Sequence, residues 1–307
     1  MSQSEYEKMN KTRRKTPLFF HQFGKKSRDF FGKGYCGHSK TFMVSTTSTA
    51  NGLTLTSAAT KRFIDSTEAV RAEYKYKNHH TAVQIDTVRF PICSAYYSYE
   101  FKYLPFAKAK ASFRYPNWSS SKFQLWSRPH RNAMLHLHAD LSKSHPKIRL
   151  SASIGTPSIA FGFQGMLGRN YGIAYTAWSG GIQVTRPYFD AAITIRDRLK
   201  EDTYPFSTRG VFLRASYIQY LDEAKKIAAG LEITGWSARK EHTIRAGGSW
   251  AIGDLTSVKA KIDHLGNVTT LLQYDIQDKF LFKISAGFNI KALDKDPIIG
   301  FFLVLKP

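Results

Sequence analysis

Few of the residues that could do chemistry stand in a pattern that chemistry needs. His136 and His138 lie two apart and would share one face of a strand, as a metal-binding pair could, but the sequence offers no third ligand. Gly162, Gly165 and Gly168 are not followed by Gly-Lys-Ser or Gly-Lys-Thr, so they form no phosphate-binding loop. No Ser/His/Asp set and no pair of carboxylates stands out. We therefore predict no catalytic residue, no metal and no cofactor.

Charge is the strongest chemical signal in the chain. The 307 residues hold 45 Lys+Arg against 23 Asp+Glu, a formal net charge of +22. Such an excess predicts an anionic partner: nucleic acid, anionic lipid or small anions that pass through a pore. Aromatic residues make up 14% of the chain, which argues against low-complexity disorder. The two cysteines, Cys36 and Cys93, form no disulfide framework.

One short helical segment precedes everything else. Residues 18–31 place four phenylalanines near one stripe and the charged residues elsewhere, which is typical of an amphipathic helix. Thr16 and Pro17 would cap its start, and Gly32 and Gly34 would end it. No apolar run approaches the length of about 20 residues that a transmembrane helix needs.

From residue 38 onward the hydrophobic period changes to two. The clearest example is Phe280–Ile290, where apolar residues alternate with polar or small ones. The segments are about 8–11 residues long, as tilted membrane strands require, and longer than most globular strands. Residues 40–307 would give about 19 strands at about 14 positions for each strand and turn. A meander of this length hides its edges by closing into a barrel.

Two kinds of barrel fit this alternation. A small soluble barrel points its apolar residues inward, whereas a membrane barrel points them outward and lines a wet lumen with polar groups. Soluble barrels filled by side chains have about 8 strands, so the larger predicted count favours a membrane barrel with an aqueous channel. A lumen rich in Lys and Arg would favour anions over cations. The predicted lumen-facing cations are Lys147, Arg149, Arg196, Arg198, Arg245, Lys259, Lys261, Lys283 and Lys291.

Several segments of the chain carry recognisable motifs. Phe23–Tyr35 is glycine- and lysine-rich around Arg28-Asp29, and a Thr/Ser-rich hairpin follows at residues 40–57. These segments resemble the N-terminal signature of the mitochondrial porins, the voltage-dependent anion channels, in which a Gly-Lys-x-Ala-Arg-Asp core precedes Lys-(Gly/Asp)-Tyr. Leu255–Ile262 is similar to the family's Leu-Thr-x-Val-Lys-Ala-Arg strand. Residues 282–307 resemble the plant-type terminus with its Leu-Lys-Pro ending. The match runs in order over about residues 20–307, as in a divergent isoform of this family.

The resemblance implies an all-β fold: a transmembrane β-barrel of about 19 strands with an N-terminal α-helix inside the pore. An odd number of strands implies that the first and last pair in parallel, with about residues 40–47 beside about residues 298–305. The chain would then divide into a basic, disordered extension at residues 1–17, a pore helix and glycine link at residues 18–37, and the barrel at residues 38–307.

The resemblance also assigns roles to individual residues. Lys108 is what remains of a Gly-Leu-Lys triplet and is a candidate nucleotide contact. Gly300, Leu303 and Leu305 resemble the sorting signal in the last strand of outer-membrane barrels. Gly32 and Gly34 would form a flexible link between the helix and the first strand. The charges that the helix would hold at the constriction are Lys25, Lys26, Arg28, Asp29 and Lys33.

The function implied is a voltage-gated, anion-selective channel of the mitochondrial outer membrane. It would pass ATP, ADP, phosphate and chloride and contact outer-membrane lipids, with a homo-oligomer and a tRNA contact as further hypotheses. A basic β-protein that binds nucleic acid or anionic lipid without conducting would also explain the charge, although the cations spread over most strands. A soluble lipid-binding barrel would explain the alternation. A planar-bilayer recording separates the channel from the first alternative, and solubility without detergent would favour the second.

Overall fold

The computed structural model describes residues 17–35, 41–62, 66–87, 91–101, 107–116, 121–141, 146–170, 173–200, 208–237, 241–276, 280–294 and 296–305. Within these ranges the chain forms a 3-10 turn, an α-helix and 19 strands. The predicted extension at residues 1–17 falls almost wholly outside the described part, as do residues 36–40. No helix in the described part has the length and apolar character to cross a membrane.

The strands follow one another as a meander. The N-terminal turn η1 is Phe20–Gln22 and the helix α2 is Lys25–Gly32. The first ten strands are β1 Thr41–Ala50, β2 Leu53–Arg62, β3 Ser66–Tyr76, β4 His79–Thr87, β5 Pro91–Phe101, β6 Ala107–Tyr115, β7 Lys122–His130, β8 Ala133–Asp140, β9 Lys147–Gly155 and β10 Ile159–Asn170. The remaining strands are β11 Ile173–Thr185, β12 Phe189–Lys200, β13 Thr208–Tyr220, β14 Ile227–Trp236, β15 Glu241–Ala251, β16 Thr256–Asp263, β17 Asn267–Ile276, β18 Phe280–Asn289 and β19 Ile298–Leu305.

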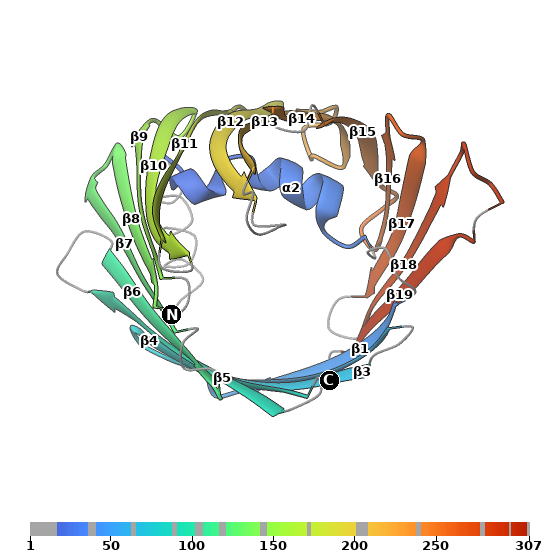
Figure 1. Ribbon diagram of the computed structural model, residues 1–307. Helices are drawn as coiled ribbons and strands as arrows, with labels where there is room; N and C mark the ends of the chain where they lie inside the picture. Colours follow the sequence, from blue (N-terminus) through green and yellow to red (C-terminus); the bar gives the residue numbers. More distant parts are fainter. Residues whose placement is uncertain are drawn as a thin grey trace.

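The sheet closes on itself. Consecutive strands pair antiparallel, and β1 then pairs with β19 in parallel, in a register that runs from Thr41 opposite Gly300 to Thr46 opposite Leu305. The predicted barrel and the predicted parallel closure are both confirmed. Closure leaves no sheet edge, so every strand finds backbone partners on both sides. Figure 1 shows the ring of strands with α2 on its inner side, beneath β12–β14.

The two faces of the barrel are inverted relative to a soluble core. On β9, Ile148 and Leu150 are more than half exposed, whereas Ser151 and Ser153 are buried. Ser153 faces inward, because its hydroxyl donates to the carbonyl oxygen of Leu18 in the N-terminal segment. The apolar residues therefore point outward, as a lipid-facing surface requires. This arrangement confirms the membrane barrel and rules out the soluble one.

The N-terminal segment differs from the single helix predicted for residues 18–31. It is divided into η1 and α2 by Phe23 and Gly24. Gly24 has a φ of 64°, in the left-handed region that glycine enters without steric cost. Its amide donates to Gln183 Oε1 on β11 at 2.8 Å, so the barrel wall supports the break. Gly32 ends α2, as predicted, and the predicted cap at Thr16 lies outside the described residues.

Candidate functional site

Phenylalanines dock the N-terminal segment onto glycines of the inner wall. A side chain at Gly162 on β10 would collide with the ring of Phe20. On the far side of α2, a Cβ at Gly230 would lie 2.9 Å from Phe30, and one at Gly247 would lie 3.1 Å from Phe31. The absence of a side chain at these three glycines thus makes room for the aromatic rings, which supply the apolar contact with the wall.

Buried acids on the wall hold the polar face of α2. Lys26 Nζ lies 2.6 Å from Asp190 Oδ2 on β12. Ser27 Oγ donates to Glu232 Oε2 on β14 at 3.2 Å, and Arg245 Nη1 donates to Oε1 of the same carboxylate at 3.3 Å. The side chains of Asp190 and Glu232 are each 3% exposed. Buried carboxylates require such partners, so helix and wall are joined by charge as well as by packing.

The C-terminal end of α2 is capped by a predicted lumen cation. Lys261 Nζ on β16 donates to the carbonyl oxygen of Phe31 at 2.6 Å, where the partial negative charge of a helix end favours a cation. The same ammonium lies 4.1 Å from the centre of the Tyr35 ring, and burial raises the pKa of the Tyr35 hydroxyl to about 12. Lys261 therefore anchors the link that leaves the helix.

All five charged residues predicted for the helix lie on α2 or directly after it. Lys25, Lys26 and Lys33 are exposed to the interior, and Asp29 is half-buried. Arg28 instead bonds its own segment, because Nη1 donates to Phe23 O at 2.6 Å and Nη2 to His21 O at 3.1 Å. Burial and the nearby Arg214 lower the pKa of Arg28. Gly34 adopts a φ of 94°, so the predicted glycine link contains a left-handed turn.

Most predicted lumen cations share the inward face of their strands. Lys147 and Arg149 alternate with the outward Ile148 and Leu150, and Arg196 follows Asp190 at even spacing along β12. Arg245 and Lys261 face inward because they bond Glu232 and the helix. Lys259 lies two residues from Lys261, and Lys283 lies two residues from the buried Ser285, so both share the inner face. The side chain of Arg198 falls outside the described part.

Lys291 was predicted to face the lumen, but the structure does not place it on a strand. It lies in the turn after β18, which ends at Asn289, and its Nζ donates to the backbone carbonyl of His264 at 3.4 Å. The alternation of Phe280–Ile290 continues past the last ladder pair of this strand, so the sequence pattern ran two residues too far.

Lys108 lies on β6 and pairs with an acid. Its Nζ is 3.1 Å from Glu100 Oε1 on the neighbouring strand, and its cross-strand partner on the other side is Trp126. Both contacts put it on the inner face. Its predicted contact with a nucleotide stays a prediction.

The proposed sorting residues occupy both faces of the last strand. Gly300 stands opposite Thr41 and Ser285, and the inward Ser285 fixes its face. Leu303 and Leu305 alternate to the outer face with the exposed Phe301. Their recognition by a sorting machinery stays a prediction.

The structure adds a third imidazole to the histidine pair noted in the sequence. The ring centres of His21 on the N-terminal segment and His136 on β8 lie 4.9 Å apart, and Trp126 stacks on His136 at 5.1 Å. His21 belongs to η1 and not to a strand, so strand periodicity gave no signal for this contact. Among the described residues, no group of His, Cys, Asp and Glu has an arrangement that could hold a metal ion.

Comparison with known proteins agrees with this architecture. A model of the eukaryotic porin family matches residues 16–300. Mitochondrial outer membrane protein porin 2 of Arabidopsis thaliana is 34% identical over 293 residues, which cover 95% of this chain and 99% of the relative. Mitochondrial outer membrane protein porin 5 of Oryza sativa subsp. japonica is 31% identical over 293 residues, with the same coverage.

The closed barrel with its outward apolar face agrees with the eukaryotic porin family that the comparison gives. The family consists of channels and not of enzymes, and the protein is a β-barrel of the mitochondrial outer membrane. With a family model that spans nearly the whole chain and relatives above 30% identity, this chain belongs to the eukaryotic porin family.

Proposed function

We propose that this porin is a voltage-gated, anion-selective channel that passes small metabolites, among them ATP, ADP, phosphate and chloride. The observation that carries the proposal is the imbalance between exposed amines and buried acids on the inner face. Lys25, Lys26 and Lys33 are exposed on or beside α2, whereas Asp190 and Glu232 are buried against cations. Around α2 the accessible charge is thus mainly positive, and a pore lined by cations favours anions.

The contacts of α2 support voltage gating by this segment. Its polar attachments are the Lys26–Asp190 ion pair, the Ser27–Glu232 hydrogen bond and the Lys261 cap. A helix that carries several cations feels the transmembrane potential at about 2.3 kcal/mol per charge per 100 mV over the full field. Moving it through part of that field would therefore have to overcome these polar contacts, of about 1 kcal/mol each, and the packing of Phe30 and Phe31 on the wall.

A planar-bilayer recording of the refolded protein tests both parts of the proposal. We expect discrete conductance steps, a zero-current potential in a KCl gradient that favours chloride, and partial closure at higher voltage. The double variant Lys25→Gln with Lys33→Gln should lower the preference for chloride, because it removes two exposed amines. Cation selectivity of the unaltered protein would contradict the proposal, and absence of conductance with correct folding would favour a non-conducting binding protein.

Two finer partner hypotheses belong to the same proposal. The net charge of +22 supports a contact with tRNA, whose phosphates attract Lys and Arg. Association of barrels into a homo-oligomer within the membrane is the second hypothesis; lipid already satisfies the outward apolar face that such an oligomer would use. Salt-dependent retention of tRNA by barrels in vesicles, and cross-linking between barrels at low protein density, are the measurements that check these two hypotheses.

A further inference from the structure

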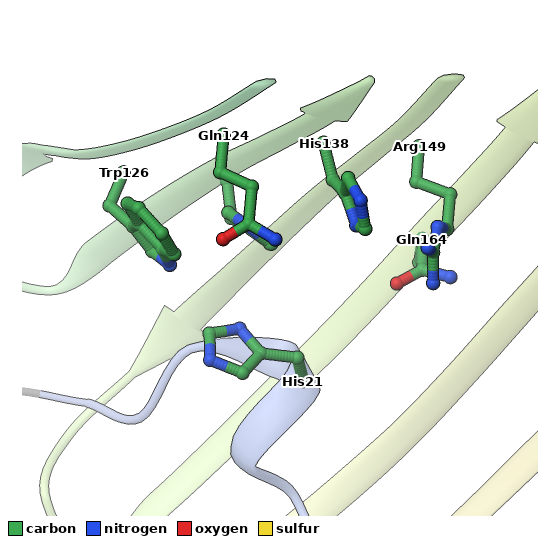
Figure 2. Close-up of a pocket in the computed structure, with 7 residues that line it drawn as sticks. His21, Gln124, Trp126, His138, Arg149 and Gln164 are labelled. Carbon is green, nitrogen blue, oxygen red and sulfur yellow. The ribbon is translucent and has the colours of Figure 1, made fainter. Parts of the chain in front are cut away.

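A small pocket lies between the N-terminal segment and the inner wall at β7–β10. Its volume is about 220 Å³. Figure 2 shows His21 facing a row of side chains that project from the wall, with Trp126 at one end and Arg149 at the other. His136 and His138 from β8 lie within this row, and Gln124 and Gln164 complete the lining.

The pocket gathers unpaired nitrogen atoms, and no acid is among the described residues that line it. The Nε2 atoms of His136 and His138 and the Nε atom of Arg149 are buried, and none has a hydrogen-bond partner among the described residues. The fixed charge of the lining is the guanidinium of Arg149, and none of the lining residues is acidic. Buried polar groups cost free energy when they are left unpaired. An acceptor-rich, negatively charged ligand would satisfy the guanidinium and present its oxygens to the imidazole N–H groups.

The size of the pocket limits the ligand. A cavity of about 150 Å³ holds a benzene molecule, whereas sites for drug-sized ligands measure about 300–1,000 Å³. The present pocket therefore has room for a tetrahedral oxyanion with a few waters, but not for a whole nucleotide.

We propose that this pocket is a binding site for a phosphate-type oxyanion, and that the bound anion bridges the N-terminal segment to the wall. Arg149 and His138 contact the oxyanion from the wall, and His21 contacts it from the N-terminal segment. The lining of the site does not include Lys25, Lys26 or Lys33, and binding to it requires no ion flow. The proposal therefore stands or falls independently of anion selectivity and voltage gating.

Calorimetric titration of the refolded protein in detergent, with inorganic phosphate at constant ionic strength, tests the site. We expect saturable binding with one phosphate per barrel. Arg149→Gln should weaken it about tenfold or more, because a hydrogen-bonded charge is lost. His138→Gln should weaken it less, and it keeps the proposal testable if the arginine variant does not fold. Arg71→Gln on β3 is the matched control: it also removes an inward arginine, and phosphate affinity should stay within about twofold of the unaltered protein.

The source of the oxyanion and the bridge need separate measurements. ATP that competes with phosphate would identify the phosphoryl group of a metabolite as the ligand, whereas phosphate binding without competition would identify the free ion. In either case, saturating phosphate should slow hydrogen exchange of the Phe20–Phe23 amides in the unaltered protein and not in the Arg149→Gln variant. Non-saturable binding, equal binding by the Arg149→Gln and Arg71→Gln variants, or exchange that phosphate leaves unchanged would overturn the proposal.

Discussion

The wall that carries α2 and the wall opposite it differ in the size of their inward side chains. Beneath α2 and η1 the inner face is built largely from residues such as Gly162, Ala192, Ser216, Ala228 and Gly230. Figure 1 places β3–β5 across the barrel from α2. There and on the adjoining β6 the inward residues are long and bond one another, among them Arg71, Glu73, His80, Tyr96 and Lys110.

This difference explains why the helix lies on one side. Arg71 donates to the Tyr96 hydroxyl at 2.9 Å, and Lys110 lies 3.9 Å from the centre of the same ring. The long side chains of that wall thus have partners within the wall itself. The other wall has recesses at glycine, and its buried acids Asp190 and Glu232 accept further contacts from Lys26 and Ser27 of the helix. The position of α2 is therefore set by complementarity of shape and charge.

Filling one glycine recess should have the largest effect on the docking of the N-terminal segment. Gly162→Val places a branched side chain where Phe20 now packs, and overpacking of this kind costs about 3 kcal/mol. We expect η1 to leave the wall, with faster hydrogen exchange over Phe20–Phe23 and noisier open-channel current.

Gly165→Val on the same strand is the control for this substitution. Gly165 alternates to the outer face, and a Cβ there meets nothing within 4 Å. It should leave exchange of the N-terminal segment unchanged. Equal effects of the two variants would show that strand flexibility, and not the recess for Phe20, accounts for the result.

Removing one buried acid should have the next largest effect. Glu232→Gln keeps an acceptor for Ser27 but removes the negative charge that faces Arg214 and Arg245. We expect a loss of about 2 kcal/mol in the free energy of unfolding, below the range for fully buried pairs because both arginines are partly exposed. Chloride selectivity should rise because the lumen gains net positive charge. A urea titration and a zero-current potential measure the two effects, and unchanged selectivity would show that this carboxylate does not influence the ion path.

The sequence predicted the barrel better than it predicted the site. A period of two defines each strand and its faces, and an odd number of strands leads to the parallel closure between β1 and β19. Alternation also separates Gly162 from Gly165, but it does not reveal that Phe20 packs on the first of them. That contact joins two distant segments, for which a single sequence has no periodic signal. For the same reason the sequence did not predict the contact between His21 and His136. It also did not predict the break at Gly24, because the surrounding structure determines the φ that a glycine adopts.

A surface ion pair of α2 should contribute less than the buried acid. Lys26 is 47% exposed although Asp190 is buried, so solvent screens the pair, and the Tyr220 hydroxyl still donates to Asp190 Oδ2 at 3.0 Å when Lys26 is removed. The contribution of the pair should therefore stay below about 1 kcal/mol. Lys26→Gln should therefore change stability little and reduce chloride selectivity by a step comparable to Lys25→Gln. A markedly larger loss of stability would mean that the pair, and not the aromatic recesses, positions the helix.

Acidification should give the smallest effect, since it acts through one proton on the N-terminal segment. Contact with the wall, followed by the charges of Lys25 and Arg28, lowers the pKa of His21 below its ordinary value of 6.5. The docked segment thus prefers the neutral imidazole, and its docking free energy is complete above pH 6.5 and declines as the pH falls toward the lowered pKa. At zero phosphate, the protection of the Phe20–Phe23 amides against hydrogen exchange, corrected for the intrinsic exchange rate at each pH, should fall in that range. His21→Gln should flatten this dependence without abolishing docking, because the aromatic contact of Phe20 with the glycine recess carries no titratable group. A dependence that survives the substitution would assign the proton to the wall, and the difference between the two walls would then extend to their response to pH.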